Sequence, residues 1–122
     1  MTALLFVAVS WLAPENLPPV AQPGQWTFVE ASPEELIRDQ WAGTGDEDVM
    51  VRIAWRESRF ECDAKNPRSS AAGLFQTLAL HKPRAERLGL SWVEVSTECW
   101  ASIALAWDLY QEQGTAPWKA TR

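Results

Sequence analysis

Glu57 is the residue whose surroundings in the sequence most clearly suggest chemistry. The pattern predicts a helix through it, and Val49, Ile53 and Phe60 share its face because residues three or four apart lie on one stripe. A carboxylate on a core-facing stripe costs desolvation free energy unless it is paired or protonated. Glu57 is therefore a candidate proton donor. A surface residue at a helix end is the alternative interpretation.

The environment expected for Glu57 favours its protonated form. It lies near the end of the predicted helix, where the helix dipole opposes a negative charge by roughly 0.3–1 kcal/mol. Burial raises the pKa of a carboxyl group as well. Arg56 and Arg59 are neighbours in sequence, but offsets of one and two do not face Glu57 on a helix. A carboxyl group with a raised pKa can protonate the oxygen of a glycosidic bond near neutral pH.

The segment after this helix predicts an irregular loop at the edge of a polar groove. Small, hydroxyl-bearing and turn-forming residues follow one another in the order Asn66-Pro67-Arg68-Ser69-Ser70-Ala71-Ala72-Gly73-Leu74-Phe75-Gln76. Such residues favour turns over regular structure. We expect this loop to lie beside Glu57.

Capping signals and periodicity predict a small, mostly α domain. Ser32-Pro33-Glu34-Glu35 indicates a capping box with Pro at the first helical position, and this helix should run to about Trp41. Asp46 is expected to cap the next helix, 47 to about 59. Further helices are predicted over 83–88 and 98–113, a short one near Gly73, and the only tempting strand over 92–95.

Composition bounds the class of protein. A chain of 122 residues, 47% hydrophobic with eight Trp, predicts one small domain with a sizeable core. Core packing is the plainer explanation for most of the Trp residues, and lining of a sugar-binding groove is the alternative. The net charge of −5 argues against a nucleic-acid partner and gives no steering toward an anionic polymer or membrane.

The first 30 residues differ from the rest of the chain. Residues 1–13 are apolar but too short for a membrane-spanning helix, which needs about 20 residues. They resemble the apolar part of a signal peptide without its basic start. Four prolines between positions 14 and 23 indicate a linker. We therefore divide the chain into a segment of residues 1–30 and a domain of 31–122. An export segment and an element packed on the domain both stay open for residues 1–13.

Cys62 and Cys99 are the two cysteines of the chain. Their spacing fits no C-x-x-C motif, and with one His they make a poor zinc set, so we expect no metal. A disulfide between them would contribute roughly 3–4 kcal/mol by loop-closure entropy. Two separate thiols, as in a reducing compartment, are the alternative, and we favour the bridge.

The residues from Glu57 onward closely resemble the signature of soluble lytic transglycosylases and related lysozyme-like domains. That signature reads Glu-Ser-x-Phe, a short loop with Asn, a hydroxyl residue, then Ala-x-Gly-Leu-x-Gln. In this chain it appears as Glu57-Ser58-Arg59-Phe60, Asn66-Pro67, and 69–76. A softer similarity, typical of a short bacterial or phage member, extends the match to about residues 47–118 through Arg84-Ala85, Leu109-Tyr110 and Gly114-Thr115-Ala116-Pro117-Trp118.

The resemblance implies a lysozyme-like fold with an irregular, β-poor loop region beside the cleft. Glu57 matches the catalytic acid that protonates the bridging oxygen between N-acetylmuramic acid and N-acetylglucosamine. The resemblance further implies a substrate-binding set of Ser69, Ser70, Gly73, Leu74, Gln76 and Tyr110. Gly73 and Leu74 would allow close backbone approach beneath the sugar. Tyr110 and Trp118 either line the groove or pack the C-terminal helix.

The chain also departs from the family pattern. Ser70 stands where the family usually has Gly, the Tyr-Asn-x-Gly element of longer members is absent, and the sequence pI is about 4.8. These departures bear on loop conformation and on affinity for an anionic wall more than on the chemistry.

The number of carboxylates separates two mechanisms. A hydrolase commonly needs a second carboxylate as base or nucleophile. Glu61 and Asp63 lie near Glu57 in sequence but fall in the predicted loop. We therefore favour a single-acid lytic transglycosylase that leaves a 1,6-anhydro product, with a muramidase as the alternative. A catalytically idle glycan-binding or virion module and a helical interaction protein are the alternatives from other classes.

The resemblance also sets expectations for partners and location. We expect a monomer without a cofactor that binds peptidoglycan strands, binds no nucleic acid and has no stable membrane span. Its place of action would be extracytoplasmic, after export or delivery by a phage.

Overall fold

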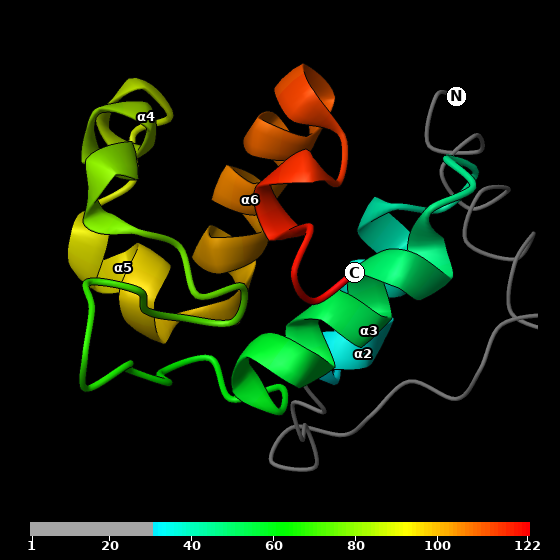
Figure 1. The fold of residues 1–122 in the computed structure, drawn as a ribbon. Coiled ribbons are helices and arrows are strands. Elements are labelled where there is room, and N and C mark those ends of the chain that lie inside the picture. The colour runs from blue at the N-terminus through cyan, green and yellow to red at the C-terminus, as the bar shows by residue number, and fades with distance from the viewer. Residues whose placement is uncertain (1–30) are drawn as a thin grey trace, which may run out of the picture. The chain divides into compact units, whose positions relative to one another are not determined.

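The computed structural model describes residues 31–122 (Figure 1). The predicted apolar segment and linker, residues 1–30, lie outside them. In chain order the helices are α2 (Pro33–Gln40), α3 (Glu47–Ser58), α4 (Lys82–Arg87), α5 (Trp92–Thr97) and α6 (Cys99–Gln113). Single turns of 3-10 helix occur at η2 (Ala79–His81) and η3 (Ala116–Trp118). The prediction of a mostly α domain is confirmed.

Capping boxes set the start of two helices. Ser32 Oγ accepts from Glu35 N at 3.2 Å, and the Glu35 carboxylate accepts from Ser32 N at 3.0 Å, as predicted. Ser91 and Glu94 form the same pair at the start of α5. The prediction of a strand over 92–95 is therefore wrong, because these residues lie in α5. The Ser-x-x-Glu spacing outweighs the β propensity of the Trp and Val residues there.

The prediction of a short helix near Gly73 is also wrong. No helix begins near Gly73, because Gly73 (φ +82°) and Gln76 (φ +50°) adopt left-handed conformations that an α-helix does not tolerate. Antiparallel bridges between Lys65 and Ala72 and between Ala72 and Thr77 frame this turn. The loop is thus irregular and β-poor, as expected.

Asp46 occupies the N-cap position of α3, but its side chain makes no capping hydrogen bond. It accepts instead from the Tyr110 hydroxyl at 2.7 Å. The cap predicted for Asp46 is therefore replaced by a contact that joins the start of α3 to α6.

The larger hydrophobic core joins α2, α3, α6 and η3 around Trp41, which is completely buried. The Trp41 ring contacts Trp107 and Tyr110 edge-on and Phe75 at a tilt. A smaller core lies between α4, α5 and α6 and contains Ala85, Leu90, Val95, Ala101 and Leu105. Because α6 contributes to both cores, it holds the two sides of the domain together (Figure 1).

A disulfide joins Cys62, in the loop after α3, to Cys99, the first residue of α6, with their Cα atoms 4.9 Å apart. It anchors the beginning of the loop to the central helix. Within residues 31–122, no helix is both long and apolar enough to cross a membrane.

Candidate functional site

Glu57 lies in the last turn of α3 and is half-buried. Burial raises the pKa of its carboxyl group above the ordinary value. The Thr121 hydroxyl donates a hydrogen bond to Glu57 Oε2 at 2.8 Å and lowers the pKa, but burial is the larger effect. Glu57 is therefore a carboxyl group that holds its proton to higher pH than an exposed one.

The Glu57 cavity, of about 90 Å³, opens beside this carboxyl group. Its lining combines polar groups with apolar side chains: Glu57, Gln76, Thr77, Leu78, His81, Leu109, Pro117 and Trp118. Burial, the larger cause, and nearby Arg84 lower the pKa of His81. These surroundings favour the neutral imidazole over the imidazolium cation beside Glu57.

The residue after Glu57 fastens the loop to the helix. Ser58 is buried, and its hydroxyl lies 3.0 Å from the Ala54 carbonyl oxygen and 2.7 Å from that of Leu74. Arg59 and Phe60 then adopt left-handed conformations, φ +55° and +64°, which end the helix. The Glu-Ser pair thus supplies the half-buried carboxyl group and the attachment of the loop to α3.

Gln76, which the resemblance assigns to substrate binding, lines the same cavity as Glu57. Its side-chain Nε2 donates to the carbonyl oxygens of Ala64 at 3.1 Å and Gly73 at 3.0 Å. The bond to Ala64 spans the loop, and the bond to Gly73 closes the turn at 73–76. Gln76 therefore braces the loop in addition to lining the cavity.

Gly73 and Leu74 face the protein interior. A Cβ atom on Gly73 would lie 2.5 Å from the Val95 carbonyl oxygen and 3.2 Å from Ser102 Oγ. Leu74 is completely buried. The close approach that Gly73 permits is therefore an approach to α5 and α6. The expected approach was to the sugar.

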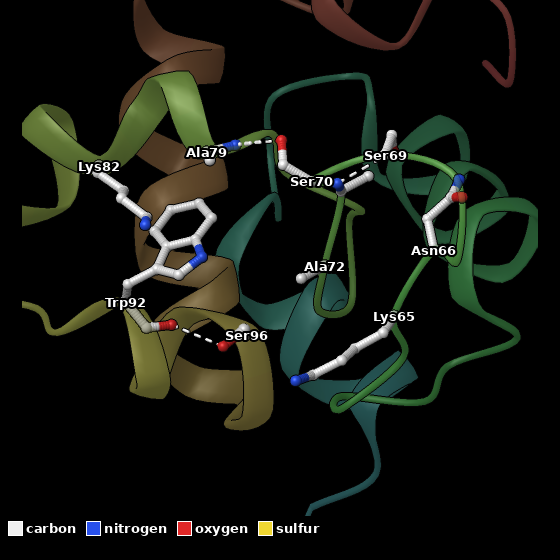
Figure 2. A pocket seen from close by; sticks show the side chains of 10 residues that line it. Lys65, Asn66, Ser69, Ser70, Ala72, Ala79, Lys82, Trp92 and Ser96 are labelled. Atoms are coloured by element: carbon white, nitrogen blue, oxygen red, sulfur yellow. Dashed lines mark hydrogen bonds between the residues drawn. The ribbon is translucent and has the colours of Figure 1, made fainter.

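Ser69 and Ser70 are exposed and do not line the Glu57 cavity. They line a separate pocket of about 300 Å³ (Figure 2). Ser69 Oγ accepts from Ala71 N at 3.1 Å, and Ser70 Oγ accepts from Ala79 N at 2.9 Å. The structure thus brings Gln76 to Glu57 and places the two serines in a second pocket.

Tyr110 lies away from the Glu57 cavity lining. Its ring stacks on Trp107 with centroids 5.6 Å apart, and its hydroxyl donates to Asp46. Of the two roles left open for Tyr110, these contacts are those of packing. Trp118, by contrast, lines the cavity, and its Nε1 donates to the Phe75 carbonyl oxygen at 3.2 Å.

Two threonines beside Glu57 were missed in the sequence. Thr77 lines the cavity and is 4% exposed. Its hydroxyl has no hydrogen-bond partner within the described part of the chain. Its position directly after Gln76 was the available signal. Thr121 lies 64 residues from Glu57 and carries no local signal.

Within residues 31–122, no three His, Cys, Asp or Glu residues lie close enough to hold a metal ion. No curated protein and no solved structure shows a significant match to the chain. A sequence model described as the transglycosylase SLT domain matches residues 35–117. This range is well over half of the 122 residues and contains Glu57, the loop and Gln76. The chain therefore belongs to the transglycosylase SLT domain family, whose general activity is the lytic cleavage of peptidoglycan.

Proposed function

We propose that this protein is a lytic transglycosylase that cleaves the β-1,4 bond between N-acetylmuramic acid and N-acetylglucosamine with Glu57 alone. One observation carries the proposal: among the described residues, Glu57 is the single carboxylate that lines its cavity. Glu61 and Asp63 are exposed and lie outside that lining. A hydrolase would commonly place a second carboxylate within about 5–10 Å of the acid.

In the first step, the protonated Glu57 carboxyl group donates its proton to the bridging oxygen, and the bond from that oxygen to C1 of the muramic sugar breaks. The departing N-acetylglucosamine keeps the proton as its 4-hydroxyl group. Half-burial supports this step because it raises the pKa of Glu57, so the acid is protonated at higher pH.

In the second step, the 6-hydroxyl oxygen of the same muramic sugar attacks C1 and closes a 1,6-anhydro ring. The proton of that hydroxyl group passes to the Glu57 carboxylate, which restores the starting acid. One carboxyl group thus serves first as acid and then as base. Water is not consumed, so no second carboxylate is needed to activate it.

The apolar wall of the cavity supports the same chemistry. Leu109 is 2% exposed and Trp118 is 5% exposed, and both line the space beside Glu57. Side chains of this kind limit the water that surrounds the carboxyl group. They favour the neutral acid before transfer and reduce competition by water for C1.

The experiment that tests the proposal is digestion of purified peptidoglycan by the wild-type protein and Glu57→Gln. We expect Glu57→Gln to lose release of soluble muropeptides by several orders of magnitude, because Gln has the same shape but no transferable proton. Glu61→Gln, a change at an exposed carboxylate outside the cavity, should retain activity. Unchanged release by Glu57→Gln would refute the site.

Mass spectrometry of the released fragments tests the mechanism separately from the site. We expect 1,6-anhydro ends, which weigh one water less than reducing ends. Reducing ends would instead identify a muramidase with the same acid. Because peptidoglycan lies outside the cytoplasm, this function also supports the proposal that the protein acts there.

A further inference from the structure

The lysine pocket, defined by Lys65, Asn66, Ser69, Ser70, Lys82 and Trp92, is the larger of the two spaces beside the loop, at about 300 Å³ (Figure 2). Its complete lining also includes Ala71, Ala72, Ala79 and Ser96. Two lysines and no acidic side chain line it, although the chain as a whole carries a net charge of −5. A local excess of positive charge on an acidic protein points to an anionic ligand.

The two ammonium groups come from different parts of the fold. Lys82 begins α4, and its Nζ lies 5.9 Å from the centre of the Trp92 ring on α5. Lys65 precedes the loop turn, and Figure 2 shows its ammonium group directed toward the hollow from the other side. Neither lysine forms an ion pair within the described residues, so both charges remain available to a ligand.

The polar neighbours of the lysines offer hydrogen-bond donors. The oxygens of Ser69 and Ser70 each already accept a backbone N–H, so their O–H groups remain free to donate. Asn66 Oδ1 accepts from Arg68 N at 2.8 Å, which leaves the Asn66 side-chain N–H groups. Ammonium, hydroxyl and amide donors without a carboxylate are the set that a carboxylate ligand requires.

The lysine pocket and the Glu57 cavity are formed by the same stretch of chain. Leu78 lines the cavity, and the next residue, Ala79, lines the pocket. Ala72 of the pocket and Thr77 of the cavity exchange two backbone hydrogen bonds of 3.1 and 2.9 Å. A ligand bound in the lysine pocket therefore lies next to the Glu57 cavity.

We propose that the lysine pocket binds a carboxylate of the peptide that hangs from the muramic sugar, while the glycan strand lies at Glu57. This inference rests on the proposed function, because it takes the peptide-bearing strand as the substrate. A pocket of about 300 Å³ is at the small end of ligand sites, which suits the end of a peptide better than a whole disaccharide.

The test is a binding titration with the Glu57→Gln protein, which binds without turnover. The probes are muramyl dipeptide with a free carboxylate, the same compound with that carboxylate amidated, and a chitin trisaccharide, which has no carboxylate. We expect the amidated dipeptide and the trisaccharide to bind about tenfold more weakly than the free acid, the usual effect of losing a partly solvated charge-assisted contact.

Matched lysine variants locate the contact. Lys65→Met and Lys82→Met, each in the Glu57→Gln background, should weaken binding of the free acid about tenfold and leave the amide unaffected. Lys119→Met removes an equal charge from an exposed position outside the pocket and should change neither. Affinity for the free acid should also fall as salt rises from about 0.05 to 0.5 M, because exposed charges are screened.

Three outcomes would overturn the inference. They are equal binding of acid and amide, no effect of either lysine variant, and binding of acetate or inorganic phosphate as tightly as the muramyl dipeptide. The last result would identify a general site for small anions. Failure of the proposed function is distinguishable, since a wild-type protein that leaves peptidoglycan intact but binds the free acid through its lysines retains the pocket and lacks the cleavage.

Discussion

The Glu57 cavity and the lysine pocket share a loop but differ in size, burial and charge. The cavity, about 90 Å³, combines one carboxyl group with the buried side chains of Leu109 and Trp118. The pocket, about 300 Å³, combines exposed Lys65 and Lys82 with hydroxyl and amide donors. One space favours a neutral acid, and the other favours a bound anion.

The difference shows why the two roles need separate places. An ammonium group within about 4–6 Å of a carboxyl group favours its charged form and lowers its pKa. A lysine beside Glu57 would therefore favour loss of the proton that the proposed mechanism requires. The turn at 72–77 contributes Ala72 to the lysine pocket and Thr77 to the Glu57 cavity, and neither lysine lines the cavity. Under the proposed function, the loop would therefore attract an anionic substrate without ionising Glu57.

Gly73→Ala should disturb the Glu57 cavity and the lysine pocket together, because it should lower the free energy of unfolding more than any other change considered. The added Cβ would lie 2.5 Å from the Val95 carbonyl oxygen, and φ of +82° disfavours any side chain. We expect a loss of about 2–4 kcal/mol, from overpacking and backbone strain combined. Thermal or chemical denaturation measures it.

Gly89→Ala is the matched control for that change. Gly89 has a similar φ of +76°, but nothing lies within 4 Å of its added Cβ. Only backbone strain remains there, so we expect a loss of about 1 kcal/mol. If the two variants are equally stable, the close approach of the loop to α5 contributes nothing.

Thr77→Val should affect the Glu57 cavity and leave the lysine pocket unchanged. Its buried hydroxyl has no partner among the described residues and lines only the Glu57 cavity. If that hydroxyl hydrogen-bonds the glycan, kcat/KM should fall about tenfold, while muramyl dipeptide binding at the lysine pocket stays unchanged. Removing an unsatisfied buried hydroxyl should leave the fold as stable or slightly more stable.

Ser102→Ala provides the comparison for Thr77→Val. Ser102 is another buried hydroxyl without a partner in the described structure, and it lines neither space. Its removal should affect stability in the same way and leave kcat/KM alone. An equal loss of activity in both variants would show that the effect of Thr77→Val is structural.

Local signals explain the parts of the fold that the sequence predicts well. The capping box at Ser32 and the long apolar periodicity of α6 act within a few residues, and both elements form where expected. The Ser91–Glu94 capping box is an equally local signal, but the β propensity of Trp92 and Val93 favoured the prediction of a strand there. The resemblance to lytic transglycosylases linked Glu57 to Gln76, which the structure places in one cavity.

Nonlocal contacts explain what the sequence did not predict. Lys65 and Lys82 line one pocket because the loop folds back toward α4 and α5. No local sequence pattern links the two residues. Gly73 was expected beneath a sugar because glycine has no side chain. The structure shows that it packs against α5 and α6, a contact that depends on how these helices fold against the loop. Side-chain type thus predicted the chemistry better than it predicted which surface each residue faces.

Thr121→Val should give the smallest effect and the most specific one, a shift of the pH profile. The Thr121 hydroxyl donates to Glu57 Oε2 and so stabilises the charged carboxylate. Without it the pKa of Glu57 rises further. Because the proposed mechanism requires the protonated acid, the high-pH limb of kcat/KM should move to higher pH, while the maximum falls by about fivefold at most from poorer positioning.

Thr121→Ser decides whether the hydroxyl itself is responsible. Serine retains the donor to Glu57 and loses only a methyl group, so its profile should coincide with that of the wild-type protein. The hydroxyl also lies 3.3 Å from the Trp118 carbonyl oxygen, and a merely structural role there would change stability without moving the limb. A limb that stays in place in Thr121→Val would therefore assign Thr121 to packing, and burial alone would set the pKa of Glu57.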